Sequence, residues 1–287
     1  MTVPSENSAE HALPVDWLLG FSTIGAPELS FSGACRLAGQ SDMDFLELRS
    51  LGGTIDLPAY FQNKDPGARR PGQPVRVVAT SLCLIGSSPR DLAEFYRFAA
   101  LARQLRAPYL RVFGKGGDAA GKPSAQELEE AARCMDQVRK GLSQLENPCE
   151  PLLETHDAFS YPEACAALNS LLEKPVLILW DSHHTWRVAG ESPEDSWRQL
   201  GDLVRHVHYK DSLPGNGPSH PIRYTIPGGG CYPTCALRDL LQKVNYTGGI
   251  SLEWEKLWHP ELPPLETALP KFRDLFPRRS QTSFPPS

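Results

Sequence analysis

The sequence lacks any long apolar run. The longest run, residues 175–180, is much shorter than the roughly 20 residues that a helix needs to cross a bilayer. The first ten residues are polar and hold no apolar signal region. There is also no block of like charges, and the net charge is only −5, which argues against a broad basic surface for nucleic acid. We therefore expect a soluble, cytoplasmic protein that binds neither membranes nor nucleic acid.

Cysteine is sparse and scattered. The chain has seven cysteines, whereas a secreted disulfide framework is denser and usually has an even number. Cys231 and Cys235 form a CxxxC motif, but no second pair lies near enough to complete a structural zinc site. Reduced thiols are therefore expected.

The ends of the chain have a different composition from its middle. Residues 1–13 and 277–287 are polar or proline-rich, so we predict two disordered tails. Residues 14–276 contain no long linker. At roughly 100–200 residues per domain, the length of 287 residues allows one large domain or two ordinary ones.

Eight short apolar segments recur along the chain. Each is bounded by turn residues and most are too short for a helix, as is typical of parallel strands buried on both faces. The segments are residues 17–21, 45–49, 75–84, 109–113, 151–156, 176–181, 204–209 and 250–254.

Helix signals lie between these segments. Ser124 and Glu127 form a capping box that predicts a helix to about Leu145, and Ser88-Pro89 predicts another to Leu105. Residues 50–74 predict a long loop with a short helix near 57–62. Eight strands alternating with helices in one domain predict a (β/α)8 TIM barrel, and an open doubly wound sheet is the alternative.

Acidic and histidine side chains follow the last four predicted strands. Glu154, Asp181, His208 and Glu253 lie 27, 27 and 45 residues apart, and the last interval includes a Pro/Gly-rich insertion at 212–230. In a TIM barrel these four side chains would meet at the C-terminal mouth. Three carboxylates and an imidazole suit Mn²⁺ or Mg²⁺, and also Co²⁺ or Zn²⁺, whereas without a cation the carboxylates would repel one another.

Other charged residues share these strands. Glu47 and Arg49 alternate with apolar neighbours, so both point into the barrel or its mouth. We expect either a structural ion pair between them or a substrate contact by Arg49, because buried charges are normally paired. Lys210 shares a strand face with His208 and is expected to contact substrate. His156 shares a face with Glu154 and would reach a substrate oxygen.

Four segments together carry a family resemblance. They resemble the xylose isomerase-like superfamily of TIM barrels, and most closely its sugar phosphate isomerase/epimerase branch, which includes ketose 3-epimerases and inosose dehydratases. The segments are Leu153–His156, Asp181–His184, His206–Asp211 and Gly249–Glu253, and residues 253–262 are similar to a C-terminal signature of one branch. The resemblance covers most of residues 15–276.

The resemblance implies roles for individual residues. Glu154, Asp181, His208 and Glu253 would be the metal ligands, and Glu154 and Glu253 would also be the catalytic acid and base. His184 corresponds to a substrate-binding histidine. The family's arginine beyond the histidine of strand seven corresponds to Arg223, which the insertion displaces, and Gly228–Gly230 replaces the family's Gly-Glu-Gly turn.

These observations predict a metal-dependent enzyme that moves a proton next to a carbonyl in a sugar or polyol. An isomerase or epimerase is the first expectation, and the alternative is a lyase that eliminates a leaving group from the same enolate. A relative that cleaves DNA at abasic sites would need a richer metal cluster and basic loops, and the charge of −5 argues against it. A sugar-binding protein with a vestigial site conflicts with the intact set of four residues. Homo-oligomers are common in the family, so self-association stays open.

Overall fold

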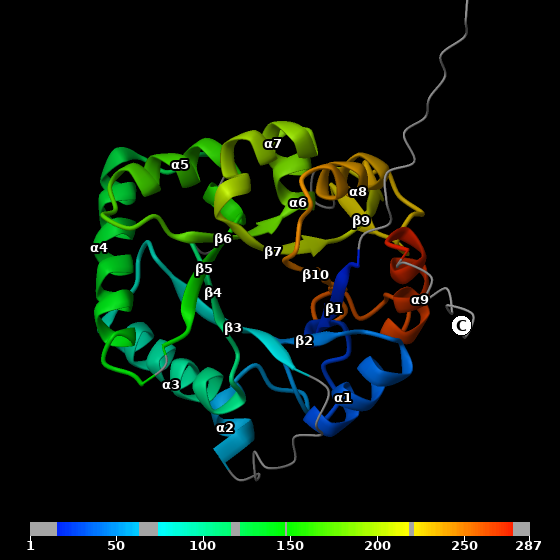
Figure 1. Cartoon of the computed structure of the whole chain (residues 1–287), viewed down its shortest axis with the longest axis horizontal. Helices are drawn as coiled ribbons and strands as arrows, with labels where there is room; N and C mark the ends of the chain where they lie inside the picture. Colours follow the sequence, from blue (N-terminus) through cyan, green and yellow to red (C-terminus); the bar gives the residue numbers. More distant parts are fainter. Residues whose placement is uncertain (1–15, 63–73, 116–120, 147, 218–220, 278–287) are drawn as a thin grey trace, which may run out of the picture.

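A computed structural model describes residues 16–62, 74–115, 121–146, 148–217 and 221–277. The predicted tail at 1–13 lies outside these residues, as does the predicted tail at 277–287 except for Pro277. The described chain forms a closed barrel of parallel strands surrounded by helices (Figure 1). The prediction of a single (β/α)8 TIM barrel is therefore confirmed.

All eight predicted strands are present in the barrel. Parallel pairing runs around it in the order β1-β10-β7-β6-β5-β4-β3-β2, and β1 pairs with both β10 and β2. Because all the strands are parallel, their C-terminal ends form one rim, where side chains from distant parts of the sequence meet. The strands are β1 Leu18–Ser22, β2 Phe45–Leu48, β3 Val75–Cys83, β4 Tyr109–Phe113, β5 Glu150–Glu154, β6 Leu177–Asp181, β7 Val204–Tyr209 and β10 Gly249–Leu252.

The helices pack around the outside of the strands. Ser88 with Asp91 and Ser124 with Glu127 form capping boxes at the starts of α3 and α4, and in each the serine hydroxyl accepts from the acidic residue's N–H. No helix in the described residues is long and apolar enough to cross a membrane. The helices are α1 Phe31–Gln40, α2 Leu57–Gln62, α3 Pro89–Leu105, α4 Ala125–Leu142, α5 Pro162–Ser170, α6 Ser182–His184, α7 Pro193–Leu200, α8 Thr234–Lys243 and α9 Leu265–Leu275.

The main apolar core lies between the strands and the helices. Phe21, Trp180 and Phe272 are among its fully buried members. Inside the barrel is a much smaller apolar cluster of Val77, Leu152 and Leu179, so much of the interior is left to polar side chains. A polar interior near the C-terminal rim is what an active site in this fold needs.

The insertion after β7 forms an antiparallel hairpin that the sequence analysis did not predict. Its strands are β8 Ser212–Pro214 and β9 Ile222–Tyr224, with Leu213 opposite Arg223. Asp211 holds the base of this insertion. Its two carboxylate oxygens accept backbone N–H bonds from Ser212, Gly228, Gly230 and Tyr232 at 2.9–3.1 Å.

Candidate active site

The four residues predicted as metal ligands converge at the C-terminal rim. Glu154 and Asp181 end β5 and β6, His208 is the last residue but one of β7, and Glu253 follows β10 directly. One ligand atom from each lies within 4.8 Å of those of the other three. All four residues are buried, and Glu253 is the most exposed at 6%.

The donor atoms of this cluster are oriented toward a common centre. Glu154 Oε1, Asp181 Oδ2, His208 Nδ1 and Glu253 Oε2 are buried and make no hydrogen bond of good geometry, although the Lys210 ammonium forms ion pairs with the Asp181 and Glu253 oxygens. His208 Nδ1 lies 3.3 Å from Glu154 Oε1 and 3.2 Å from Glu253 Oε2. Ligands about 2.1 Å from a tetrahedral ion lie roughly 3.4 Å apart. The spacing and chemistry of these atoms therefore fit a divalent cation.

Other residues hold the outer atoms of the cluster. Arg111 NH1 lies 2.5 Å from Glu154 Oε2, and its NH2 donates to the carbonyl of Thr80 at 3.1 Å. Asp181 Oδ1 accepts the backbone N–H of His184 at 2.9 Å. These contacts leave one oxygen of each carboxylate for the centre of the cluster.

The cluster shifts the pKa values of its members in different directions. Burial raises the pKa of Glu154, but Arg111 and His208 together outweigh it and lower the pKa to about 2. Burial lowers the pKa of His208, whereas Glu253 and Glu47 raise it, so that it lies well above its usual range. Burial, together with Glu253 and Glu154, raises the pKa of Asp181 although Lys210 lowers it. A cation at the centre would relieve the repulsion among these carboxylates.

Lys210 lies against the cluster. Its ammonium group is 2.8 Å from Asp181 Oδ2, 2.6 Å from Glu253 Oε2 and 2.7 Å from Glu255 Oε1. We predicted a substrate contact for Lys210, and the structure shows this cation neutralising three carboxylates.

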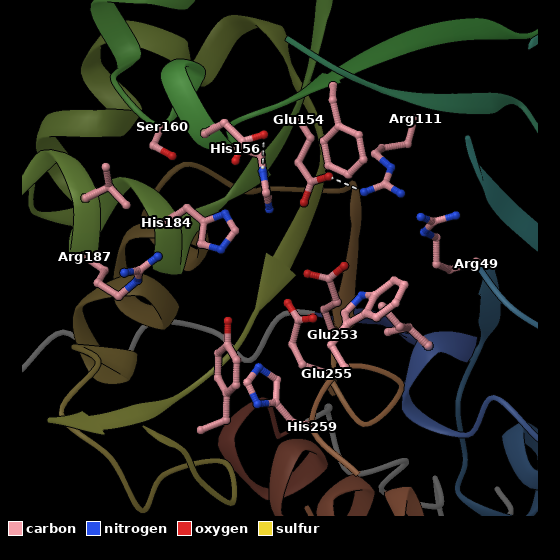
Figure 2. Close-up of a pocket in the computed structure, with 16 residues that line it drawn as sticks. Arg49, Arg111, Glu154, His156, Ser160, His184, Arg187, Glu253, Glu255 and His259 are labelled. Atoms are coloured by element: carbon pink, nitrogen blue, oxygen red, sulfur yellow. Dashed lines mark hydrogen bonds and ion pairs between the residues drawn. The ribbon is translucent and has the colours of Figure 1, made fainter. Parts of the chain in front are cut away.

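A cavity of about 600 Å³ opens beside the cluster. Two of the predicted substrate contacts, His156 and His184, lie in its wall with their ring centroids 4.5 Å apart, and Glu154 and Glu253 reach it from the cluster (Figure 2). The neighbouring His183 faces elsewhere, because its Nε2 lies 2.8 Å from Ser212 Oγ. The geometry thus settles which of the two adjacent histidines faces the cavity.

Arg223 is not among the residues that line this cavity. It is exposed on β9 and lines a second cavity of about 550 Å³, which shares Tyr224 and His259 with the first. Because successive side chains of a strand point to opposite faces, Tyr224 reaches the first cavity while Arg223 does not. Trp258 also lines the first cavity.

The prediction of an ion pair between Glu47 and Arg49 is wrong. Glu47 Oε2 lies 3.1 Å from His206 Nε2 and 2.8 Å from His208 Nε2, across the inside of the barrel. Arg49 lines the cavity instead. Arg111 was not predicted from the sequence. An arginine between Leu110 and Val112 on a buried strand was the available signal, because such a charge must find a partner.

A barrel with a buried carboxylate–histidine cluster at its C-terminal rim is typical of metal-dependent TIM-barrel proteins. The sequence matches the family model described as the xylose isomerase-like TIM barrel over residues 82–275. The chain belongs to this family. No curated protein matches the sequence at a significant level.

Solved structures show the same fold. The probable 3-DHS dehydratase AsbF of Bacillus anthracis, involved in petrobactin synthesis, has a TM-score of 0.73 at 19% identity, over 93% of this chain and 100% of that one. The IOLI protein, solved with a zinc atom, has a TM-score of 0.70 at 15% identity, over 90% of this chain and 95% of that one. D-allulose 3-epimerase of Methylomonas sp., solved with D-allulose, has a TM-score of 0.62 at 15% identity, over 91% of this chain and 96% of that one.

Proposed function

We propose that this protein is a divalent-metal-dependent isomerase or epimerase that acts on a sugar or sugar derivative. The observation that carries the proposal is the convergence of four buried donor atoms, from Glu154, Asp181, His208 and Glu253, beside an open cavity. The zinc atom in IOLI and the D-allulose in the Methylomonas epimerase, which share this fold, are consistent with it. Among the cations that suit the donor set, we expect Mn²⁺, because three of the four donors are carboxylate oxygens.

The cluster residues would hold the cation, which when bound would polarise a substrate carbonyl and acidify the neighbouring C–H. Glu154 and Glu253 are proposed as the pair that moves the proton. Arg111 keeps the Glu154 carboxylate ionised and so able to accept a proton, and His208 and Lys210 act in the same way on Glu253. One carboxylate would remove the proton from one face, and the other, after taking up a proton from solvent, would donate that proton to the second face of the enediolate.

The histidines of the cavity would orient the sugar. Burial lowers the pKa of His184 well below its usual range, so its ring is neutral and can both donate and accept a hydrogen bond. His156 Nδ1 lies 2.9 Å from Asp157 Oδ2, which leaves its Nε2 for a substrate oxygen. Both rings line the same cavity as Glu154, so a bound hydroxyl would lie next to the reacting carbon.

Proton exchange tests this proposal. The Mn²⁺-loaded protein is incubated with a panel of ketoses in D₂O, and NMR follows deuterium at the carbon next to the carbonyl. We expect deuterium uptake together with an isomer or epimer of the substrate. Release of water with a deoxy product would instead show the alternative, a lyase.

Variants connect the exchange to the site. Glu154→Gln and Glu253→Gln should each lower the exchange rate at least about 100-fold, the scale of losing a general acid or base. Glu129→Gln is the control, because Glu129 is exposed on α4 and pairs with Arg133 at 3.7 Å, and neither residue lines the cavity. Full activity in both cluster variants would contradict the assignment.

A further inference from the structure

Arg49 is a buried cation with an unused hydrogen-bonding face. It follows the last residue of β2, and its backbone N–H donates to Thr23 Oγ1 at 2.9 Å. The residue is only 8% exposed, and its buried NH1 has no hydrogen-bond partner. Among the residues that the structure describes, no carboxylate forms an ion pair with this guanidinium. Leaving such a group without an acceptor is costly, which points to a ligand as its partner.

The other buried cations of the site are already committed. Arg111 is held by Glu154 and Thr80, and its guanidinium also stacks 3.9 Å from the ring centroid of Phe113. Lys210 is surrounded by three carboxylates. Within the described part of the chain, Arg49 is therefore the buried arginine of this cavity that has no carboxylate as an ion-pair partner.

The position of Arg49 defines where a ligand group would lie. Arg49 lines the cavity from the β2 side, and Figure 2 shows it on the opposite side of the cavity from His184 and Arg187. Glu253, a member of the four-residue cluster, lies between the two sides in this view. A molecule whose reacting carbons face the cluster could thus extend a distal group to Arg49.

We propose that Arg49 binds a carboxylate of the substrate, so that the substrate is a sugar acid and not a neutral sugar. This inference rests on the proposed function. The planar fork of a guanidinium matches the two oxygens of a carboxylate and pairs its single charge. A hydroxyl would leave the buried charge without a direct ion-pair partner. A phosphate dianion would bring a second charge, and the neighbouring Arg111 is already neutralised by Glu154.

Calorimetry on matched pairs of ligands tests the proposal. The Mn²⁺-loaded full chain is titrated with D-fructuronate and D-fructose, which differ only in a carboxylate or a hydroxymethyl group, and with D-tagaturonate and D-tagatose. At least one acid should bind 10-fold or more tightly than its neutral partner, the scale of a charged hydrogen bond. D-fructose 6-phosphate distinguishes phosphate from carboxylate, and its binding more tightly than both acids would overturn the proposal.

Variants locate the effect. Arg49→Gln should abolish the preference for the acid and leave the affinity for the neutral ketose within about twofold. Arg49→Lys keeps the positive charge but lacks the planar guanidinium fork, so it should retain part of the preference for the acid. It replaces Arg49→Gln in the test if the glutamine variant does not fold. Arg187 is an exposed arginine of the same cavity, and Arg187→Gln should reduce the preference for the acid less than Arg49→Gln does.

The outcomes separate this inference from the proposed function. Equal binding of acids and neutral ketoses, or no binding of either acid, would overturn the role of Arg49. Exchange of solvent deuterium into a neutral ketose would still support the isomerase or epimerase in that case. A preference for acids that persists in Arg49→Gln would likewise overturn the assignment to this residue.

Discussion

Glu47 holds His208 from the side of the ring that faces away from the proposed metal. The carboxylate Oε2 lies 2.8 Å from Nε2, while Nδ1 faces the oxygens of Glu154 and Glu253. In the metal-bound state the Nε2–H would donate a hydrogen bond to the Glu47 carboxylate, and Nδ1 would keep a free electron pair for the metal. Glu47 is 161 residues away from His208 in the sequence, and the closure of the barrel brings them together.

Replacing Glu47 should therefore weaken metal binding without removing a ligand. We expect Glu47→Gln to lower Mn²⁺ affinity about 10–100-fold, because the amide can no longer anchor the imidazole with a charged acceptor. Competition with a fluorescent chelator measures the change. Glu150→Gln is the matched control, since Glu150 lies at the other end of β5 and pairs with the exposed Lys174 at 3.0 Å. Equal affinity of Glu47→Gln and wild type would show that Glu47 does not orient His208.

Removing the metal should lower the thermal stability of the protein. A ligand present at 100 times its dissociation constant adds about 2.7 kcal/mol to the free energy of unfolding. In a chain of this size that amounts to roughly 5–10 °C in Tm. Thermal scans with Mn²⁺ and with EDTA should show this difference in the wild type and in Asp239→Asn, an exposed control. Asp181→Asn should lose most of the Tm difference between the Mn²⁺ and EDTA scans. A Tm difference in that variant as large as in the wild type would show that Asp181 is not a metal ligand.

The sequence was sufficient to predict the barrel and the position of the cluster. Each strand is a short apolar segment, and the parallel arrangement forces residues such as Glu154 and Asp181 at successive strand ends onto one rim. These inferences need only local pattern and the order of strands. The capping box at Ser124 and Glu127 is predictable for the same reason, because its contacts span three residues.

Pairing across the barrel could not be predicted in this way. Whether Glu47 meets Arg49 or His208 depends on how the strands are staggered around the closed sheet, which no local pattern encodes. The β8–β9 hairpin was missed because its strands have three residues each, too few for an alternating pattern. Arg223 was matched by resemblance to the family's arginine beyond strand seven. The β8–β9 hairpin changes the path of the chain in this region, so the match did not place Arg223 in the first cavity.

Asp211 should control the order of this hairpin. Replacing it with alanine would leave four backbone N–H groups without their acceptor, each in a buried or partly buried position. We expect Asp211→Ala to lose at least about 2 kcal/mol in the free energy of unfolding. Hydrogen exchange should accelerate at the amides of Gly228, Gly230 and Tyr232. Asp202→Asn, an exposed acid before β7, is the control, and unchanged exchange at the three amides would contradict the role of Asp211.

Glu127 should make the start of α4 sensitive to acid. Its carboxylate pairs with Lys115 and accepts the backbone N–H of Ser124 at 2.8 Å, and these contacts lower its pKa from 4.5 to about 2. Because the folded pKa is lower than the unfolded one, the carboxylate stabilises the fold fully above about pH 4.5. This stabilisation is lost as the pH falls through about 2.

The comparison of wild type with Glu127→Gln isolates this contribution. Wild type should have the higher Tm at pH 6, and the difference should shrink steadily between pH 4.5 and pH 2. Both proteins are measured in EDTA, so that release of metal by acid does not contribute. Asp91 caps α3 in the same way, but Ser88 is the main cause of its lowered pKa and the cation Arg90 contributes least, whereas Lys115 is the main cause for Glu127. Added salt should therefore reduce the effect of Glu127→Gln more than that of Asp91→Asn, because it screens the contribution of Lys115. A Tm difference that stays constant from pH 6 to pH 2 would show that the charge of Glu127 does not stabilise the helix.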